Sequence, residues 1–101
     1  MDQSYTNVYI VGEFAPGMYR VFRSEHYGKK LDKLDTSERD RVVKFEQALK
    51  TEPYGGKPLG YAFLREKKFG GKRVLFLVYE EHQCIFLVTI TDKKRNSTRL
   101  I

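Results

Sequence analysis

The C-terminal half of the chain contains three strand-sized segments separated by very short turns, and this pattern constrains the fold most strongly. Phe63 to Phe69, Lys72 to Tyr79 and Cys84 to Thr91 are rich in aromatic, β-branched and other apolar residues. Gly70-Gly71 separates the first pair, and Glu80 to Gln83 separates the second pair. Strands joined by connections this short must pair with their neighbours in antiparallel fashion. The sequence therefore predicts an antiparallel three-stranded meander.

The third of these segments is apolar at almost every position, including Ile85, Phe86, Leu87, Val88 and Ile90. A strand with apolar residues on both faces is typical of the middle of a sheet that is covered on each side. We therefore expect this strand to be central and covered on both faces.

The first half of the chain carries the signals of two short helices. Ser24 is a suitable N-cap for a helix over residues 25–34, and Asp35 followed by Glu38 marks a second helix start. The apolar stripe of the second helix consists of Val42, Phe45 and Leu49, and the helix ends before Pro53. Two helices joined so closely are expected to form an antiparallel helical hairpin.

The strand-like residues 19–23 precede these helices, so the expected fold class is α+β in the order β-α-α-β-β-β. The helical hairpin would pack on one face of a four-stranded sheet. At 101 residues the chain is long enough for one domain, which we place at residues 18–101. Residues 1–17 are expected to be an N-terminal extension in which Val8 to Val11 is a candidate extra edge strand.

The net charge of +6 is confined to one half of the chain. Residues 1–53 contain nine basic and nine acidic side chains, whereas residues 54–101 contain ten basic and four acidic ones. A one-sided excess of Lys and Arg favours a polyanionic partner such as a nucleic acid. The alternative is a basic surface that only keeps the protein in solution.

Several other classes of protein are disfavoured by the residue content. One cysteine and two histidines do not form a familiar zinc site, so neither a metal nor another cofactor is expected. The start of the sequence shows no export signal, and no apolar run is long enough for a membrane span. With the single Cys84, these features lead us to expect a cytoplasmic protein without a membrane partner.

The basic residues of the meander are expected to converge at one edge of the sheet. Alternation along residues 63–69 puts Arg65 and Lys67 on one face of the strand and Glu66 and Lys68 on the other. Arg73 follows the glycine turn and should lie across from Lys67 or Lys68. The Lys93–Arg95 run ends the third strand beside the start of the second. Internal RNA cleavage needs a base, an acid and donors for the charged phosphorane. Crowded lysines and arginines can supply such groups. A solvated basic rim is the simpler alternative.

The segment LREKKFGGKRVLFLVY, from Leu64 to Tyr79, together with the closing Asp92-Lys93-Lys94, resembles the RelE/ParE superfamily of type II toxin–antitoxin toxins. The resemblance covers residues 18–101. It implies a four-stranded antiparallel sheet with two helices on one face. For RelE-like members it also implies a metal-independent, commonly ribosome-dependent mRNA endonuclease that blocks translation.

The same resemblance implies roles for individual residues. Arg73 matches the arginine that opens the central strand and stabilises the phosphate transition state, and Lys94 matches the basic residue near the scissile phosphate. Lys67 completes the expected catalytic set of Arg73, Lys94 and Lys67. The expected RNA-binding residues are Arg65, Lys68, Lys72, Lys93 and Arg95. The expected partners are a cognate antitoxin, mRNA and the ribosome.

One departure keeps two further hypotheses open. RelE-like nucleases often carry a catalytic Tyr or His near the C-terminus, and here none follows His82. This favours a ParE-like inhibitor of DNA gyrase, which shares the fold without the nuclease residues. The third hypothesis is a non-catalytic basic binding module or a decayed toxin.

Overall fold

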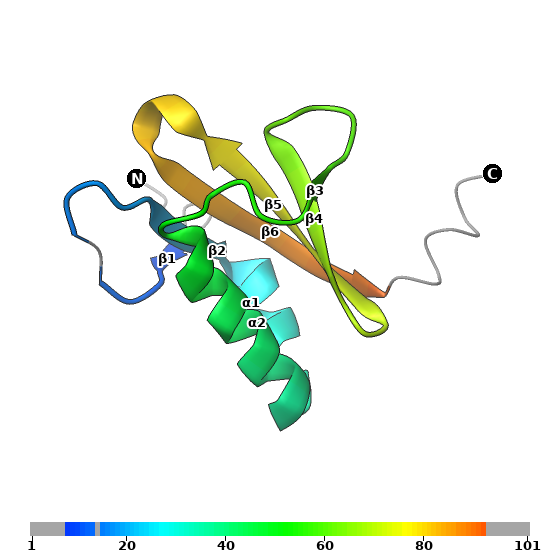
Figure 1. Cartoon of the computed structure of the whole chain (residues 1–101). Helices are drawn as coiled ribbons and strands as arrows, with labels where there is room; N and C mark the ends of the chain where they lie inside the picture. Colours follow the sequence, from blue (N-terminus) through cyan, green and yellow to red (C-terminus); the bar gives the residue numbers. More distant parts are fainter. Residues whose placement is uncertain (1–7, 14, 93–101) are drawn as a thin grey trace, which may run out of the picture.

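The structure, a computed structural model, describes residues 8–13 and 15–92 and consists of one sheet with two helices (Figure 1). The strands are β1 (Val8–Ile10), β2 (Arg20–Ser24), β3 (Lys57–Pro58), β4 (Leu64–Phe69), β5 (Lys72–Tyr79) and β6 (Cys84–Asp92). The helices are α1 (Glu25–Asp32) and α2 (Thr36–Leu49), with a 3-10 turn, η2 (Glu80–His82), between β5 and β6. The predicted α+β class, helical hairpin and meander are confirmed.

The sheet has more strands than expected and is mixed rather than antiparallel. The strand order is β1-β2-β6-β5-β4-β3, and β2 pairs with β6 in parallel fashion. The backbone N–H of Tyr19 donates to the carbonyl of Lys50 at 2.8 Å, so α2 ends beside the start of β2. After the two-residue strand β3, which runs opposite to β4, the chain enters β4 at the end of the sheet where β2 began. Both β4 and β6 consequently run in the direction of β2, with β5 running between them in the opposite direction.

The additional strands lie at the two edges of the sheet. β1 pairs with β2 in antiparallel fashion, with Ile10 opposite Phe22. β3 pairs with β4, which places Lys57 opposite Glu66. The candidate edge strand at Val8 to Val11 is thus confirmed as β1. The strand β3 was not expected, because a two-residue strand leaves almost no periodic signal in a sequence.

The hydrophobic core lies between the helices and one face of the sheet. Its central side chains are Val74, Phe76 and Val78 of β5, Ile85, Leu87 and Ile90 of β6, and Tyr27, Leu31, Val42 and Leu49 of the helices. Figure 1 shows both helices on the same side of the sheet. Burying each large apolar side chain contributes roughly 1.5–3 kcal/mol, so this face accounts for most of the stabilisation.

The opposite face of the sheet is not covered by any element in residues 8–13 and 15–92. Phe86 and Leu77 are paired across β5 and β6 on this face, and both are partly exposed. The expectation that β6 is covered on both faces was therefore wrong, although β6 does lie inside the sheet. Below, this surface is called the open face.

Side-chain caps define the helix starts as the sequence predicted. The Oγ atom of Ser24 accepts a hydrogen bond from the N–H of Tyr27 at 2.9 Å and donates to the carbonyl of Val88, also at 2.9 Å. Val88 lies where the pairing between β5 and β6 shifts register. Asp35 and Glu38 form a reciprocal capping box at the start of α2. One serine hydroxyl thus caps α1 and also bonds to β6 at the irregularity.

A charged cluster inside the core was not predicted from the sequence. Glu46 of α2 is fully buried, and Arg23 of β2 donates to its two carboxylate oxygens at 3.1 and 2.7 Å. The hydroxyl of Tyr27 in α1 donates to the same carboxylate at 2.8 Å. Burial, together with the neighbouring Glu46, raises the pKa of Tyr27 far above its ordinary value. The cluster therefore joins β2, α1 and α2 through a hydrogen-bonded carboxylate.

Candidate functional site

The hairpin of β4 and β5 separates the basic residues of its two strands onto the two faces of the sheet. The register pairs Lys68 with Arg73, Lys67 with Val74 and Arg65 with Phe76. Because Val74 and Phe76 are buried in the core, Lys67 and Arg65 lie on the helix-covered face. Lys68 and Arg73 share the open face. Alternation along β4 had predicted this separation, and the structure confirms it.

Arg65 is used within the protein to shape the loop that precedes β4. Its guanidinium donates to the carbonyls of Gly55 at 3.0 Å, Ala62 at 2.9 Å, Tyr54 at 3.1 Å and Gly56 at 3.4 Å. The residue is almost completely buried. We predicted from the resemblance that Arg65 contacts RNA, but in the structure its donors are directed to these loop carbonyls.

Lys67 is also directed away from Arg73. Its ammonium lies 5.8 Å from the ring centre of Phe45 and 6.0 Å from that of Phe69, within cation–π range of both aromatic rings. The sequence suggested that Arg73 faces Lys67 or Lys68, and the structure selects Lys68. Arg73 and Lys67, which were predicted to act together in catalysis, therefore lie on opposite faces of the sheet.

Arg73 lies at the start of β5 and contacts a buried carboxylate. Its Nη1 atom is 3.0 Å from Oε1 of Glu66, whose side chain is only 2% exposed. On the other side, Nζ of Lys57 is 3.6 Å from Oε2 of the same carboxylate. One anion therefore lies between two cations that belong to β5 and β3.

A shallow hollow of about 330 Å³ adjoins this carboxylate. It is lined by Gly56, Lys57, Glu66, Lys67 and Lys68. The carbonyl of Glu66 lies so close to Gly56 that a side chain at position 56, where φ is +71°, would collide with the backbone. The hollow with Arg73, Glu66, Lys57 and Lys68 is called the basic site below.

Lys72 and the end of β6 form a second basic edge. Nζ of Lys72 donates to Asp92 at 2.8 Å, and this hydrogen bond raises the pKa of Lys72. A hollow of about 170 Å³ here is lined by Lys30, Lys33, Leu34, Lys72, Ile90, Thr91 and Asp92. The pairing of Lys72 with Asp92 confirms that β6 ends beside the start of β5. The remaining predicted residues, Lys93, Lys94 and Arg95, lie outside the described residues.

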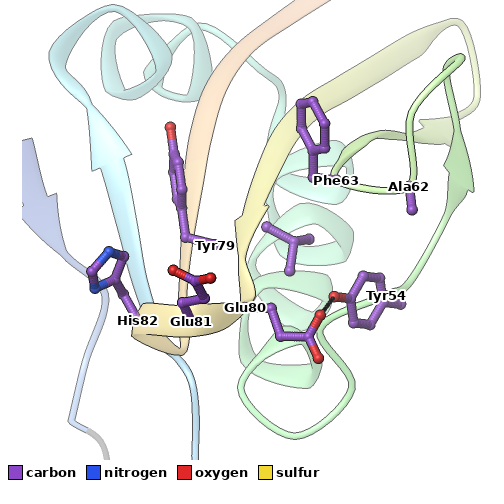
Figure 2. Close-up of a pocket in the computed structure, with 8 residues that line it drawn as sticks. Tyr54, Ala62, Phe63, Tyr79, Glu80, Glu81 and His82 are labelled. Atoms are coloured by element: carbon purple, nitrogen blue, oxygen red, sulfur yellow. Dashed lines mark hydrogen bonds between the residues drawn. The ribbon is translucent and has the colours of Figure 1, made fainter.

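A larger groove of about 570 Å³ lies at the opposite end of β5 (Figure 2). It is lined by Tyr54, Ala62, Phe63, Val78, Tyr79, Glu80, Glu81 and His82. The Tyr54 hydroxyl donates to Glu80 at 2.9 Å, which raises the pKa of this tyrosine. Two carboxylates repel phosphate, so this groove does not suit a nucleic-acid backbone. The basic site is therefore the stronger candidate despite its smaller volume.

Two members of the basic site were missed at the sequence level. Lys57 stands in an irregular, proline-containing segment that gave no strand signal, so its pairing with β4 was not predicted. Glu66 is the one acidic residue in the basic stretch of β4, and alternation did place it on the same face as Lys68. That alternation was the available signal, although it does not indicate that the carboxylate is buried.

Two other kinds of site find no support in the described part of the chain. Across residues 8–13 and 15–92, no group of three His, Cys, Asp or Glu side chains is arranged to hold a metal ion. In the same ranges, no helix has the length and apolar character needed to span a membrane.

Taken together, the fold and the site define a small α+β protein with an uncovered sheet face that carries a basic site. Comparison with solved structures identifies the fold. The chain is similar to the RelBE2 toxin–antitoxin complex of Mycobacterium tuberculosis, with 26% identity, a TM-score of 0.65, and coverage of 74% of this chain and 98% of that chain. The archaeal RelE–RelB complex of Pyrococcus horikoshii OT3 gives 24% identity, a TM-score of 0.67, and coverage of 76% and 97%.

A free-state RelE variant from E. coli covers 84% of this chain and 99% of its own length, with 17% identity and a TM-score of 0.68. No family model matches the sequence, and no curated protein matches it significantly. The chain therefore has the fold of RelE toxins. The fold expected from the resemblance is confirmed by these structures.

Proposed function

We propose that this protein is the toxin of a type II toxin–antitoxin pair and acts as a metal-independent, ribosome-associated mRNA endonuclease in the cytoplasm. The observation that carries the proposal is Arg73, which lies on the open face of a RelE fold with Lys68 opposite it on the neighbouring strand. Two adjacent cations on an uncovered surface suit a phosphate group that gains charge during cleavage.

The proposed chemistry is internal attack of a ribose 2′-oxygen on the adjacent phosphorus. A bond forms between the 2′-oxygen and phosphorus, and the bond from phosphorus to the 5′-oxygen breaks, which leaves a 2′,3′-cyclic phosphate and a 5′-hydroxyl. The 2′-hydroxyl loses its proton to a base, and the leaving oxygen gains one from an acid. Arg73 would bind the phosphate oxygens as their charge increases, and Lys68 would hold the adjoining backbone. Lys94 remains the predicted third catalytic cation.

Induced expression with pulse labelling of protein and DNA synthesis tests this proposal. We expect wild type to stop protein synthesis first and Arg73→Ala to be inactive while remaining folded. Lys44→Ala is the matched control, because it removes one positive charge from an exposed position of α2. If protein synthesis continues in the wild type, or if Lys44→Ala is as inactive as Arg73→Ala, the proposal is wrong.

A ParE-like inhibitor of DNA gyrase is the second candidate, favoured by the absence of Tyr and His after His82 in the sequence. The same experiment separates the two functions. If DNA synthesis stops first and cleaved DNA accumulates, the gyrase function replaces the ribonuclease function. If neither synthesis stops, the chain is a binding module with a toxin fold.

The proposed partner is a RelB-like antitoxin. The Mycobacterium and Pyrococcus structures are complexes of RelE-type and RelB-type chains, and the excess charge of residues 54–101 suits an acidic, wrapping segment. Co-expression of the antitoxin gene should restore growth. Growth arrest that persists in its presence would contradict the partnership.

A further inference from the structure

The carboxylate of Glu66 has a position that the proposed chemistry does not yet use. Glu66 lies on β4, between Lys57 of β3 and Arg73 of β5, and it is in ion-pair contact with both. The arginine side chain is 19% exposed and the lysine side chain 59%, whereas the carboxylate is 2% exposed. The anion is therefore below the surface, and the two cations reach the solvent on either side of it.

Glu66 and Arg73 form a close ion pair, but the hydrogen bonding of both side chains is incomplete. Within residues 8–13 and 15–92, neither the buried Oε1 of Glu66 nor the buried Nε of Arg73 has a hydrogen-bond partner. A buried polar atom without a partner costs about 1–3 kcal/mol, so such atoms are uncommon without a function. The guanidinium thus retains an unused donor while one of its nitrogens faces the carboxylate.

We propose that Glu66 is a positioning residue that orients the guanidinium of Arg73 for the scissile phosphate. This inference rests on the ribonuclease function proposed above. The carboxylate holds Nη1 against β4 and so restricts the orientation of a guanidinium that is 19% exposed on the open face. Orientation of this kind acts on the rate of the chemical step, because a fixed donor needs no reorganisation when charge develops.

The same carboxylate should weaken binding of RNA. It places a negative charge within 4 Å of two cations, which lowers the positive potential that attracts phosphate. Glu66 therefore has opposite effects on the two stages of the reaction. It reduces affinity for the RNA ground state and increases the rate of cleavage.

Glu66→Gln tests this inference, because it removes the charge and keeps the shape. We expect kcat to fall by about tenfold or more, as for loss of a well-oriented transition-state contact. A 2′-O-methylated single-stranded RNA, which binds without being cleaved, should bind several-fold more tightly to the variant. The salt dependence of this binding should steepen by about 0.7 in slope for each additional phosphate contact.

The control is Glu81→Gln, which makes the same charge change at an exposed position at the far end of β5. If only the loss of a negative charge mattered, both variants would bind RNA more tightly and both would keep the wild-type kcat. A fall in kcat without tighter binding would show that Glu66 serves only the folded structure. Either result would overturn the inference.

A measurement without cleavage separates this inference from the proposed function. In wild type, the Nε–H NMR signal of Arg73 should be sharp and restricted in motion, and in Glu66→Gln it should show fast side-chain motion. If wild type cleaves no RNA, the ribonuclease proposal fails, and this signal still reports whether Glu66 holds Arg73. An Arg73 signal that is equally mobile in both proteins would refute the positioning role.

Discussion

Two buried carboxylates, one on each face of the sheet, have very different surroundings. Glu46, on the helix-covered face, receives two hydrogen bonds from Arg23 and one from Tyr27. Glu66, on the open face, is equally inaccessible but has ion-pair contacts at 3.0 and 3.6 Å, and its Oε1 has no hydrogen-bond partner in the described residues. Both carboxylates face an arginine, yet only that of Glu46 accepts hydrogen bonds on both of its oxygens.

The difference separates a structural ion pair from a functional one. A buried charge is tolerated when hydrogen bonds replace the water that it loses, and Glu46 meets that condition. Glu66 meets it incompletely, and one of its two cations, Lys57, is 59% exposed, so that a ligand can reach it. Removing the first charge should therefore disrupt folding, whereas removing the second should mainly affect binding and chemistry.

Matched substitutions of the two carboxylates should give the largest contrast in stability. Glu46→Gln should lower the free energy of unfolding by about 3 kcal/mol, because the hydrogen bonds from Arg23 and Tyr27 would lose the charge of their buried acceptor. Glu66→Gln should change it by less than about 1 kcal/mol, since the lost charge has an incomplete set of hydrogen bonds and Lys57, one of its two cations, is largely exposed. Urea denaturation of both variants measures the two values.

Glu81→Gln, at an exposed position, is the reference for the loss of one charge without burial. Equal losses of stability for Glu46→Gln and Glu66→Gln would remove the distinction between the two faces. A larger loss for Glu66→Gln would reverse it.

The two arginines of the β4–β5 hairpin should show a smaller contrast of the same kind. Arg65→Ala should destabilise the fold by about 2 kcal/mol, because it leaves carbonyls of the 54–62 loop without their donor. Arg73→Ala should cost less, about 1 kcal/mol, since Lys57 still faces the Glu66 carboxylate and truncation of the arginine lets water reach it. In thermal unfolding, Arg65→Ala should have a lower Tm than Arg73→Ala. The opposite order would contradict the role of Arg65 in holding the loop.

Much of the fold could be predicted because its main elements have strong local signals. The glycine turn at Gly70-Gly71, the alternation of β4 and the caps Ser24 and Asp35 are all encoded within a few residues, and each was found in the structure. The parallel pairing of β2 with β6 has no local signal, because it depends on where the helical hairpin returns the chain. The edge strand β3 was missed because two residues carry no periodicity.

The basic site could be predicted only in part. The short glycine turn placed Arg73 across from Lys67 or Lys68, and the structure selects Lys68. They did not show that the donors of Arg65 are occupied by loop carbonyls, since that depends on how residues 54–62 fold back over β4. The burial of Glu66 depends on side chains from three strands, and no local pattern in the sequence describes such a contact.

The hydrogen bond from Tyr27 to Glu46 should make the stability of the helix-covered face sensitive to alkaline pH. Burial and the adjacent carboxylate raise the pKa of Tyr27 in the folded protein above its ordinary value of 10.0. The stabilisation from the protonated tyrosine is therefore fully present below pH 10 and is lost as the pH rises from there toward the folded-state pKa, because the unfolded chain ionises first. Between pH 9 and pH 11, wild type should lose about 1 kcal/mol more stability than Tyr27→Phe, which cannot ionise.

Urea denaturation of wild type and Tyr27→Phe at several pH values measures both free energies of unfolding. Subtracting one from the other cancels the effect of the lysines, which titrate in both proteins. Tyr61→Phe is the matched control, since it removes a hydroxyl from an exposed ring and should follow the wild-type curve. Below pH 9, Tyr27→Phe should be less stable than wild type by about 1 kcal/mol, because the Glu46 carboxylate loses one donor. The gap should then narrow as the pH rises. A constant gap would mean that Tyr27 does not reach the buried carboxylate in solution, so Glu46 would resemble Glu66 more closely than the structure indicates.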